Sequence, residues 1–240
     1  MSQRYFAPYG RAPVHYPLES SQRTGVALAD TELIIVEGDS AAKSVNQVRD
    51  ATRQSVLALQ GKPMNVGKAC HSVLLKNDIL RRFASTLLGR KITPIEDWSV
   101  PLAQAEFCRY GRVAILMDPD ADGIHCGVLA LGILLRFTPE LLRQGRVSVV
   151  RPPMFLFRVE TASEENPVRT FVASNPEHAK RVEQKLREAG VQQFERFRHR
   201  GLGSIPSEIL RHHCVQPNTR ADDVMSFEEA ETAVAMFGGR

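Results

Sequence analysis

Three carboxylates stand at alternate positions in Asp118-Pro-Asp-Ala-Asp-Gly123, between two apolar runs. Ionised side chains this close repel one another, and a divalent cation is the simplest counter-ion. All the ligands are oxygens and no Cys or His pair is near, so the segment favours Mg²⁺, Mn²⁺ or Ca²⁺ over zinc. An EF-hand calcium loop begins in the same way but needs a Glu at its twelfth position and a helix before it. Leu129 stands there and the preceding run is typical of a strand, which excludes an EF-hand. A solvated acidic turn without metal is the remaining alternative.

A fourth carboxylate, Glu37, follows another short apolar run. Glu32–Val36 is β-branched and ends in a glycine turn, and residues 41 to about 59 have the composition of a helix. Residues 112–117 predict the strand that precedes the acidic segment. Because open parallel sheets bind ligands at the carboxyl ends of their strands, neighbouring strands here would bring all four carboxylates together. Such a cluster can hold one or two Mg²⁺ ions for phosphoryl transfer.

Strands and helices alternate along the chain, which predicts an α/β sheet. Residues 1–30 have no sustained periodicity and are expected to form an extended arm. We expect an α/β domain over residues 31–160 and a small α+β extension over 161–240. Near the end, Ser226 and Glu229 form the pattern of a capping box that starts a last helix.

The composition is that of an ordinary globular protein, with 43% hydrophobic and 24% charged residues in a chain of 240. The formal net charge of +4 allows a polyanionic partner but does not identify one. Four widely spaced cysteines predict reduced thiols that pack in the interior. No apolar run predicts a membrane span and the first residues lack a signal-peptide pattern, so we expect a cytoplasmic protein without membrane contact.

At this level of detail the sequence resembles Toprim domains, and more narrowly the B subunits of bacterial type IIA topoisomerases, DNA gyrase and topoisomerase IV. The resemblance runs from about residue 32 to the C-terminus and implies a Toprim fold, a mainly parallel sheet flanked by helices. The motifs that carry it occur in the order of that family: Glu37-Gly-Asp-Ser-Ala41, Gly61-Lys62, Asn65-Val66, Lys68-Ala69, Asp118-x-Asp-x-Asp-Gly123 with His125, Pro139-Glu140, Pro152-Pro153 and Gly201-Leu-Gly203.

The resemblance implies roles for the four carboxylates. Glu37 would be a metal ligand and the candidate general acid or base at the leaving 3′ oxygen of DNA. Asp118 would bridge the metal positions, Asp120 would complete the second and Asp122 would support the others. The implied cofactor is Mg²⁺, with Mn²⁺ or Ca²⁺ as substitutes.

Three basic residues are implied to contact DNA phosphate, and their alternative is ordinary solvated charge. They are Lys62, Lys68 and Arg200. The implied partners are double-stranded DNA and an A-type subunit whose tyrosine attacks the phosphate. Tyr5 and Tyr110 of this chain are poor candidates for that nucleophile. The adjacent His212, His213 and Cys214 lack the spacing of a zinc site.

The chain also departs from the family pattern. Ala42-Lys43 replaces a glycine pair, Pro119 replaces Ala, Gly67 stands where an acidic residue is common, and Ser204 follows the Gly-Leu-Gly motif where Glu is usual. None of these changes removes a candidate metal ligand. The first ~30 residues are too few to encode the ATPase and transducer domains that the family carries. We therefore expect no ATP hydrolysis by this chain, with an ATPase subunit acting in trans as an open possibility.

Besides the DNA topoisomerase function that the resemblance implies, two other functions remain open. One is a non-catalytic module that binds DNA or a topoisomerase subunit and regulates it. The other is a stand-alone Toprim nuclease, which would cut DNA without a partner.

Overall fold

A six-stranded sheet carries both acidic segments. The computed structural model describes residues 15–18, 25–89, 106, 108–160 and 168–238. The strand order is β1-β3-β2-β4-β5-β9, in which the four central strands are parallel and the two edge strands antiparallel. The strands of this sheet are β1 (His15–Tyr16), β2 (Glu32–Val36), β3 (Gln54–Ala58), β4 (Arg112–Ile115), β5 (Val147–Val150) and β9 (Asp222–Val224).

Helices cover both faces of the sheet, so the central strands are buried on both sides. Leu33 and Ile35 of β2 face one layer, and Ile34 and Val36 face the other. The first layer holds α2 (His71–Lys76), α3 (Asp78–Leu88), α4 (Ala121–Phe137), α5 (Pro139–Arg143) and α8 (Phe227–Gly238). The second holds α1 (Asp39–Val48), α7 (Ser207–Leu210) and the π-helical turn η5 (Arg211–Val215). The predicted mainly parallel α/β architecture is confirmed.

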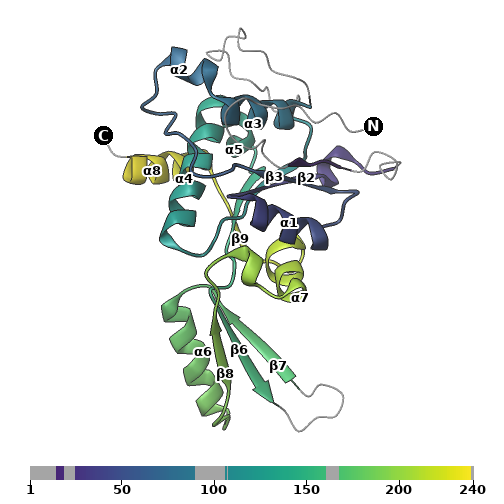
Figure 1. Cartoon of the computed structure of the whole chain (residues 1–240), viewed down its shortest axis with the longest axis vertical. Coiled ribbons are helices and arrows are strands. Elements are labelled where there is room, and N and C mark those ends of the chain that lie inside the picture. The colour runs from purple at the N-terminus through teal and green to yellow at the C-terminus, as the bar shows by residue number, and fades with distance from the viewer. Residues whose placement is uncertain (1–14, 19–24, 90–105, 107, 161–167, 239–240) are drawn as a thin grey trace.

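A smaller lobe extends from the large sheet (Figure 1). It is a three-stranded antiparallel sheet of order β7-β6-β8 with one helix packed on it. Its elements are β6 (Phe155–Glu160), β7 (Val168–Ala173), α6 (Pro176–Glu188) and β8 (Glu195–Arg198). The six-stranded sheet and the helices on its two faces form what we call the large lobe. The chain leaves it for the smaller lobe after β5 and returns to it through the short helix η4 (Leu202–Ser204). The predicted division at residue 160 stays a prediction.

One predicted element is wrong. The helix expected over residues 41 to about 59 ends at Val48, and residues 54–58 form β3 instead. A turn separates them, in which the Asp50 carboxylate accepts hydrogen bonds from the backbone and hydroxyl of Thr52. All five residues of β3 are buried between β1 and β2. Burial in the sheet therefore outweighs local helical composition here.

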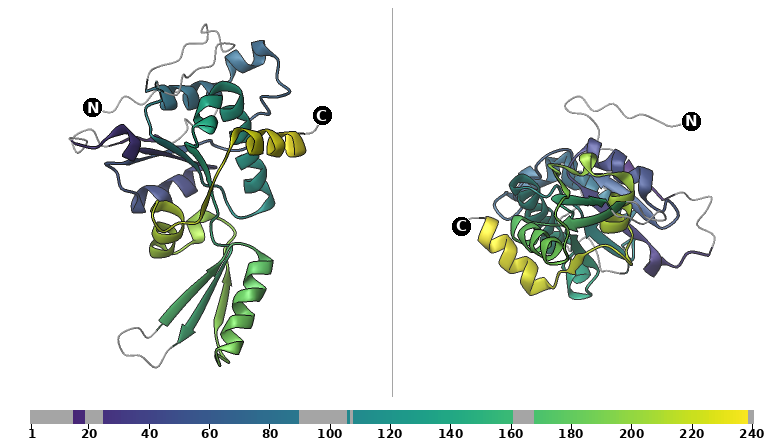
Figure 2. Two further views of the ribbon diagram at one scale, coloured as in Figure 1. Left: turned by 180° about the vertical axis from the view of Figure 1, so that it is seen from behind. Right: turned by 90° about the horizontal axis from the view of Figure 1, so that it is seen from below.

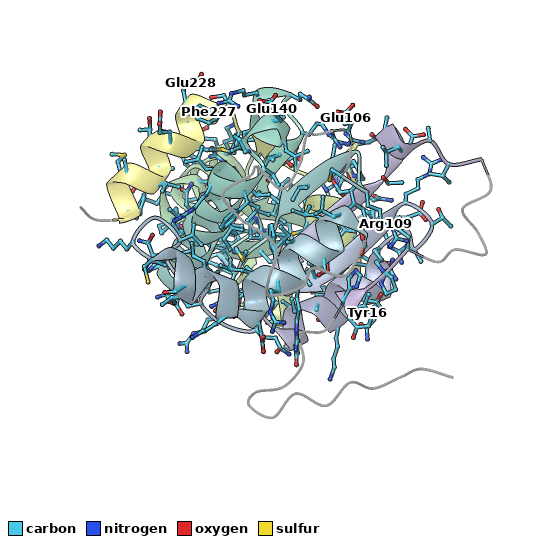
Figure 3. The ribbon with its side chains drawn as sticks, turned by 90° about the horizontal axis from the view of Figure 1, so that it is seen from above. Tyr16, Glu106, Arg109, Glu140, Phe227 and Glu228 are labelled. Carbon is cyan, nitrogen blue, oxygen red and sulfur yellow. The ribbon has the colours of Figure 1, made fainter. Side chains whose placement is uncertain are left out.

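The predicted last helix is present as α8, and it packs on α4 and α5 beside the large sheet. The Ser226 hydroxyl accepts from the Glu229 N–H (3.1 Å) and the Glu229 carboxylate accepts from the Ser226 N–H (2.9 Å), which confirms the capping box. α8 then lies against α4 (Figure 2). Figure 3 shows Phe227, its first residue, next to Glu140 of α5, and the Arg143 guanidinium lies 4.4 Å from the Phe227 ring centre.

Other predictions concern thiols and membrane contact. The four cysteines are free, and three of them are buried, but Cys70 is exposed and does not pack in the core. Tyr5 lies outside the described residues, as does most of the expected arm. Within the described ranges, no helix combines the length and apolar character needed to cross a membrane.

Candidate functional site

Two neighbouring strand ends bring the acidic residues to one edge of the large sheet. β2 and β4 pair in parallel with Ile35 opposite Ile115, and the Leu116 N–H donates to the Ile35 carbonyl (2.8 Å). Glu37 leaves the sheet two residues beyond this point on β2, and Asp118 three residues beyond it on β4. The two carboxylates therefore emerge at the same carboxyl edge, as open parallel sheets require of their ligand sites.

The turn after β4 depends on Gly123. A Cβ there would lie 2.2 Å from the Asp118 carbonyl oxygen, so no other residue allows α4 to begin this close to the strand. Asp120 caps the helix, and its carboxylate accepts from the Gly123 N–H at 2.8 Å. The acidic segment thus has a structural role of its own, because one of its three carboxylates starts the longest helix of the described chain.

Asp118 is held by the segment that returns from the smaller lobe. The Leu202 N–H donates to Asp118 Oδ1 at 2.9 Å. A Cβ on Gly201 would lie 2.9 Å from Asp118 Oδ2, and a Cβ on Gly203 would lie 2.9 Å from Ser40 Oγ at the start of α1. Both glycines therefore permit close packing of this turn, which we call the Gly-Leu-Gly turn (residues 201–203), against both acidic strand ends.

Glu37 lies in an environment that disfavours its charge. Burial comes first, and repulsion from Asp118, Asp122 and Asp120 adds to it, so the pKa of the Glu37 carboxyl is raised. The Cys126 thiol on α4 forms a hydrogen bond with this carboxylate that acts the other way. Burial raises the pKa of the Cys126 thiol to about 11, so the thiol remains protonated and donates. The negative charges of the four carboxylates are therefore only partly offset by the side chains around Glu37.

Asp118 shares this imbalance. Burial raises the pKa of its carboxyl, the Leu202 N–H opposes that shift, and Asp120 adds to it. On one side Asp118 borders an apolar cavity of about 520 Å³ between α4 and the smaller lobe. Ile124, Val128 and Met154 are among the residues that line the cavity, so little polar surface compensates the carboxylate there.

The basic candidates differ in position. The Lys62 ammonium lies 2.7 Å from Asp122 Oδ1, and this contact holds the pKa of the Asp122 carboxyl below its usual range. Arg200 is exposed and directly precedes the Gly-Leu-Gly turn. Lys68 is exposed on the turn after β3, and no contact brings its side chain to the carboxylates. Of the three, Lys62 is the residue whose side chain contacts a carboxylate of the acidic edge.

The four carboxylates suit a hard divalent cation in type and in charge, since all their donors are oxygens, and burial together with their mutual repulsion raises the pKa of Glu37. Their present arrangement is not a finished coordination shell. Within the described ranges, no three Asp, Glu, His or Cys side chains are gathered closely enough to hold a metal ion. Asp120 caps α4 and Asp122 pairs with Lys62, so a bound ion would have to draw these side chains inward.

The other reactive residues do not join the site. Tyr110 is buried with 1% of its surface exposed, and its hydroxyl donates to Ser55 Oγ at 3.2 Å. It precedes β4, at the edge opposite the carboxylates. The His212 and His213 rings lie 4.8 Å apart, and Cys214 beside them is buried.

Sequence reasoning missed two residues that shape the site. The Leu202 backbone binds Asp118 from 84 positions away, and only the paired glycines around it indicated a close approach. Cys126 was expected to pack, and its helical position four residues after Asp122 was the available signal that it faces the same site.

The class of this protein is indicated by its mainly parallel sheet, in which Glu37 follows one strand and the Asp-rich turn follows the strand that pairs with it. The family model described as Toprim domain matches residues 32–152, about half of the chain, and the chain belongs to this family. Over most of its length it is also similar to the B subunits of two bacterial topoisomerases. The DNA gyrase B subunit of Thermotoga maritima is 36% identical over 207 residues, which are 86% of this chain and 30% of that protein.

Two further relatives agree with this. The DNA topoisomerase 4 B subunit of Haemophilus influenzae is 34% identical over 194 residues, 80% of this chain and 28% of the relative. The DNA gyrase B subunit of Thermus thermophilus is 32% identical over 229 residues, 92% of this chain and 34% of the relative. The chain thus spans about a third of the length of these relatives.

Proposed function

We propose that this chain supplies the Mg²⁺-binding half of a type IIA topoisomerase cleavage centre, acting on double-stranded DNA with an A-type subunit. The observation that carries the proposal is the meeting of Glu37 and Asp118 at neighbouring strand ends, in surroundings that raise the pKa of both carboxyls. Similarity to gyrase and topoisomerase IV B subunits supports it.

The residues of the chain divide the work. Glu37, Asp118, Asp120 and Asp122 would hold the cation, which when bound would stabilise charge on the phosphate and on the attacking and leaving oxygens. Glu37 would also be the general acid or base at the leaving 3′ oxygen, where a proton must be supplied as the bond to phosphorus breaks.

The positive side chains at the edge would position the DNA. Arg200 stands beside the Gly-Leu-Gly turn and Lys62 beside Asp122, so both are placed to pair with backbone phosphates. Lys68 is a more distant phosphate contact. Tyr110 is buried and lies at the opposite edge of the sheet, which supports our proposal that a tyrosine of the A-type partner is the nucleophile.

A cleavage assay tests the proposal. Supercoiled plasmid is incubated with the chain, an A-type subunit and Mg²⁺, and nicked, linear and relaxed products are measured. We expect products that require both proteins and Mg²⁺, and their loss in Asp118→Asn. Lys180→Gln in the smaller lobe is the control, because its exposed ammonium pairs with Glu177 on the same helix, away from the acidic edge. Products that form equally with Asp118→Asn would refute the proposal.

A second function is favoured by a specific observation, the engagement of two of the four carboxylates by other groups of the chain. With Asp122 neutralised by Lys62 and Asp120 engaged as a cap, the chain could serve as a regulatory module that binds DNA or a topoisomerase subunit without cutting. Tight, Mg²⁺-independent DNA binding with a steep salt dependence and no cleavage would support this function. Cleavage by the chain alone would instead identify a nuclease.

A further inference from the structure

The opposite edge of the large sheet carries a second cavity, of about 720 Å³, which we call the amino-edge cavity. It lies where the parallel strands begin, whereas the carboxylates lie where they end. The register places Gln54, Glu32 and Arg112 side by side across β3, β2 and β4, on the face that also bears Ile34 and Ala114. This row lies between the loop after α1 and residues 216–219, which complete the lining.

Four arginines line the amino-edge cavity: Arg49, Arg53, Arg112 and Arg211. Arg49 is fixed in place, because its Nε donates to Asn46 Oδ1 (2.7 Å) and its Nη1 to the Gln54 carbonyl oxygen. Arg112 and Arg211 come from different parts of the chain, are exposed, and form no ion pair with a residue that the structure describes. Guanidinium groups bind phosphate oxygens in pairs, and one that is already held loses little freedom on binding.

The acidic residues of the cavity offset only part of this charge. Glu32 is already neutralised, since Arg220 donates to both its oxygens (2.6 and 2.8 Å) and both side chains are 2% exposed. Asp30 and Asp50 remain, and the Asp50 carboxylate accepts from Thr52 and pairs with Arg53 at 3.9 Å. Among the described lining residues, Asp30 is then the one carboxylate left to offset Arg49, Arg112 and Arg211.

The pKa of the nearby His15 is shifted in the direction that positive charges produce. Burial is the first cause that lowers the pKa of His15 to about 4, and the charges of Arg109 and Arg49 lower it further.

We propose that the amino-edge cavity binds the phosphate groups of a small phosphorylated molecule, held by Arg49, Arg112 and Arg211. Its volume falls within the roughly 300–1,000 Å³ of typical ligand pockets, and its polar lining suits a charged ligand better than an apolar one. A recess of this kind admits a polyphosphate chain more readily than the broad surface of a duplex. The site is separate from the acidic edge and does not depend on the proposed cleavage function.

Isothermal titration with sodium tripolyphosphate, at constant ionic strength and without Mg²⁺, tests the proposal on the full chain. Arg112→Gln combined with Arg211→Gln is expected to weaken binding by about tenfold for each arginine removed. Arg181→Gln combined with Arg187→Gln removes the same charge from exposed positions on α6 and is the matched control, expected to bind as the unmodified protein does. All four positions lie outside the core, and circular dichroism checks that both double variants fold.

Three results would overturn the proposal. One is the lack of saturable binding at millimolar tripolyphosphate, and a second is an equal loss in both double variants, which would show general electrostatic attraction. In the third, a short DNA duplex depends on Arg112 and Arg211 while tripolyphosphate does not bind. That result would assign the phosphate to the DNA backbone instead of a small molecule.

Discussion

Replacing Gly201 with alanine tests whether the Gly-Leu-Gly turn positions Asp118 for a cation. Gly201 has extended backbone angles (φ −154°, ψ 160°) that alanine adopts without strain, so the effect comes from the added methyl group alone. That group would lie 2.9 Å from Asp118 Oδ2, about 0.5 Å inside ordinary contact, and either the carboxylate or the turn must move. Such overpacking costs about 1–3 kcal/mol. At about 1.4 kcal/mol per tenfold, this predicts roughly 5- to 150-fold weaker cation binding if the cost falls on the bound state.

Titration with Mn²⁺, followed by the paramagnetic signal of the free ion, measures this affinity without any need for DNA or a partner. Asp118→Asn serves as the reference for a lost ligand. Gly132→Ala is the matched control, because the atoms nearest to a Cβ at Gly132 of α4 would be those of the Val234 and Val66 side chains at 3.8–3.9 Å, which is ordinary contact. We expect its Mn²⁺ affinity to equal that of the unmodified protein.

The prediction is wrong if Gly201→Ala binds Mn²⁺ as tightly as the unmodified protein while thermal unfolding shows that the variant is folded. In that case the Leu202 hydrogen bond would not determine where the Asp118 carboxylate lies. An equal loss in Gly132→Ala would also contradict it, because the effect would then reflect general disturbance of the large lobe.

Three further predictions concern stability. The folded-state pKa of Glu37 is raised above its ordinary value of 4.5, so its stabilising contribution is complete below that pH and is lost as the pH rises through the folded pKa. Without divalent cations, Glu37→Gln should therefore melt at a higher temperature than the unmodified protein at about pH 7 but not at about pH 4; a lower melting temperature at about pH 7 would contradict this. Arg220→Met leaves the buried Glu32 without its ion-pair partner and should lower the free energy of unfolding in urea by about 3–5 kcal/mol, whereas a loss below about 1 kcal/mol would contradict this role of the pair. Ser226→Ala removes the cap of α8 and should cost about 1 kcal/mol in the same titration, with Ser226→Thr as the conservative control that retains the stability.

Local pattern was sufficient to find the two strand ends. The β-branched run of Glu32–Val36 and the apolar run before Asp118 are strands buried on both faces. Each is therefore an unbroken apolar run in the sequence and can be recognised as a strand. Glycine marks the turn after each strand. The positions of Glu37 and Asp118 at strand ends therefore followed from the sequence, as did the capping box of α8.

Strand neighbours were harder to predict, because pairing joins distant segments. β2 and β4 are adjacent although β3 lies between them in the chain, and β3 itself was expected to be part of a helix. Its run of Val56, Leu57, Ala58 and Leu59 suits a buried helix or a buried strand equally well, and only the partners on both sides decide.

The contacts that adjust the charges of the site could not be predicted from residue type. Leu202 acts through its backbone N–H, and a leucine gives no indication of that role. Glu32 and Arg220 lie 188 positions apart, and each alone resembles ordinary surface charge. These interactions are set by the return of the chain from the smaller lobe.

The segment that returns from the smaller lobe also determines how this lobe can influence the acidic edge. After β8 the chain binds Asp118 through Leu202 and is then anchored by Arg220, whose side chain is 2% exposed and bonded to Glu32 and Asp222. Breaking the buried anchor costs about 3–5 kcal/mol, whereas a single hydrogen bond to a carboxylate contributes about 1.5–3 kcal/mol. A displacement of the lobe would therefore be absorbed at the Gly-Leu-Gly turn before it reaches the anchor. Because that turn contacts Asp118 directly, the position of the smaller lobe and the affinity of the acidic edge for a cation should be coupled.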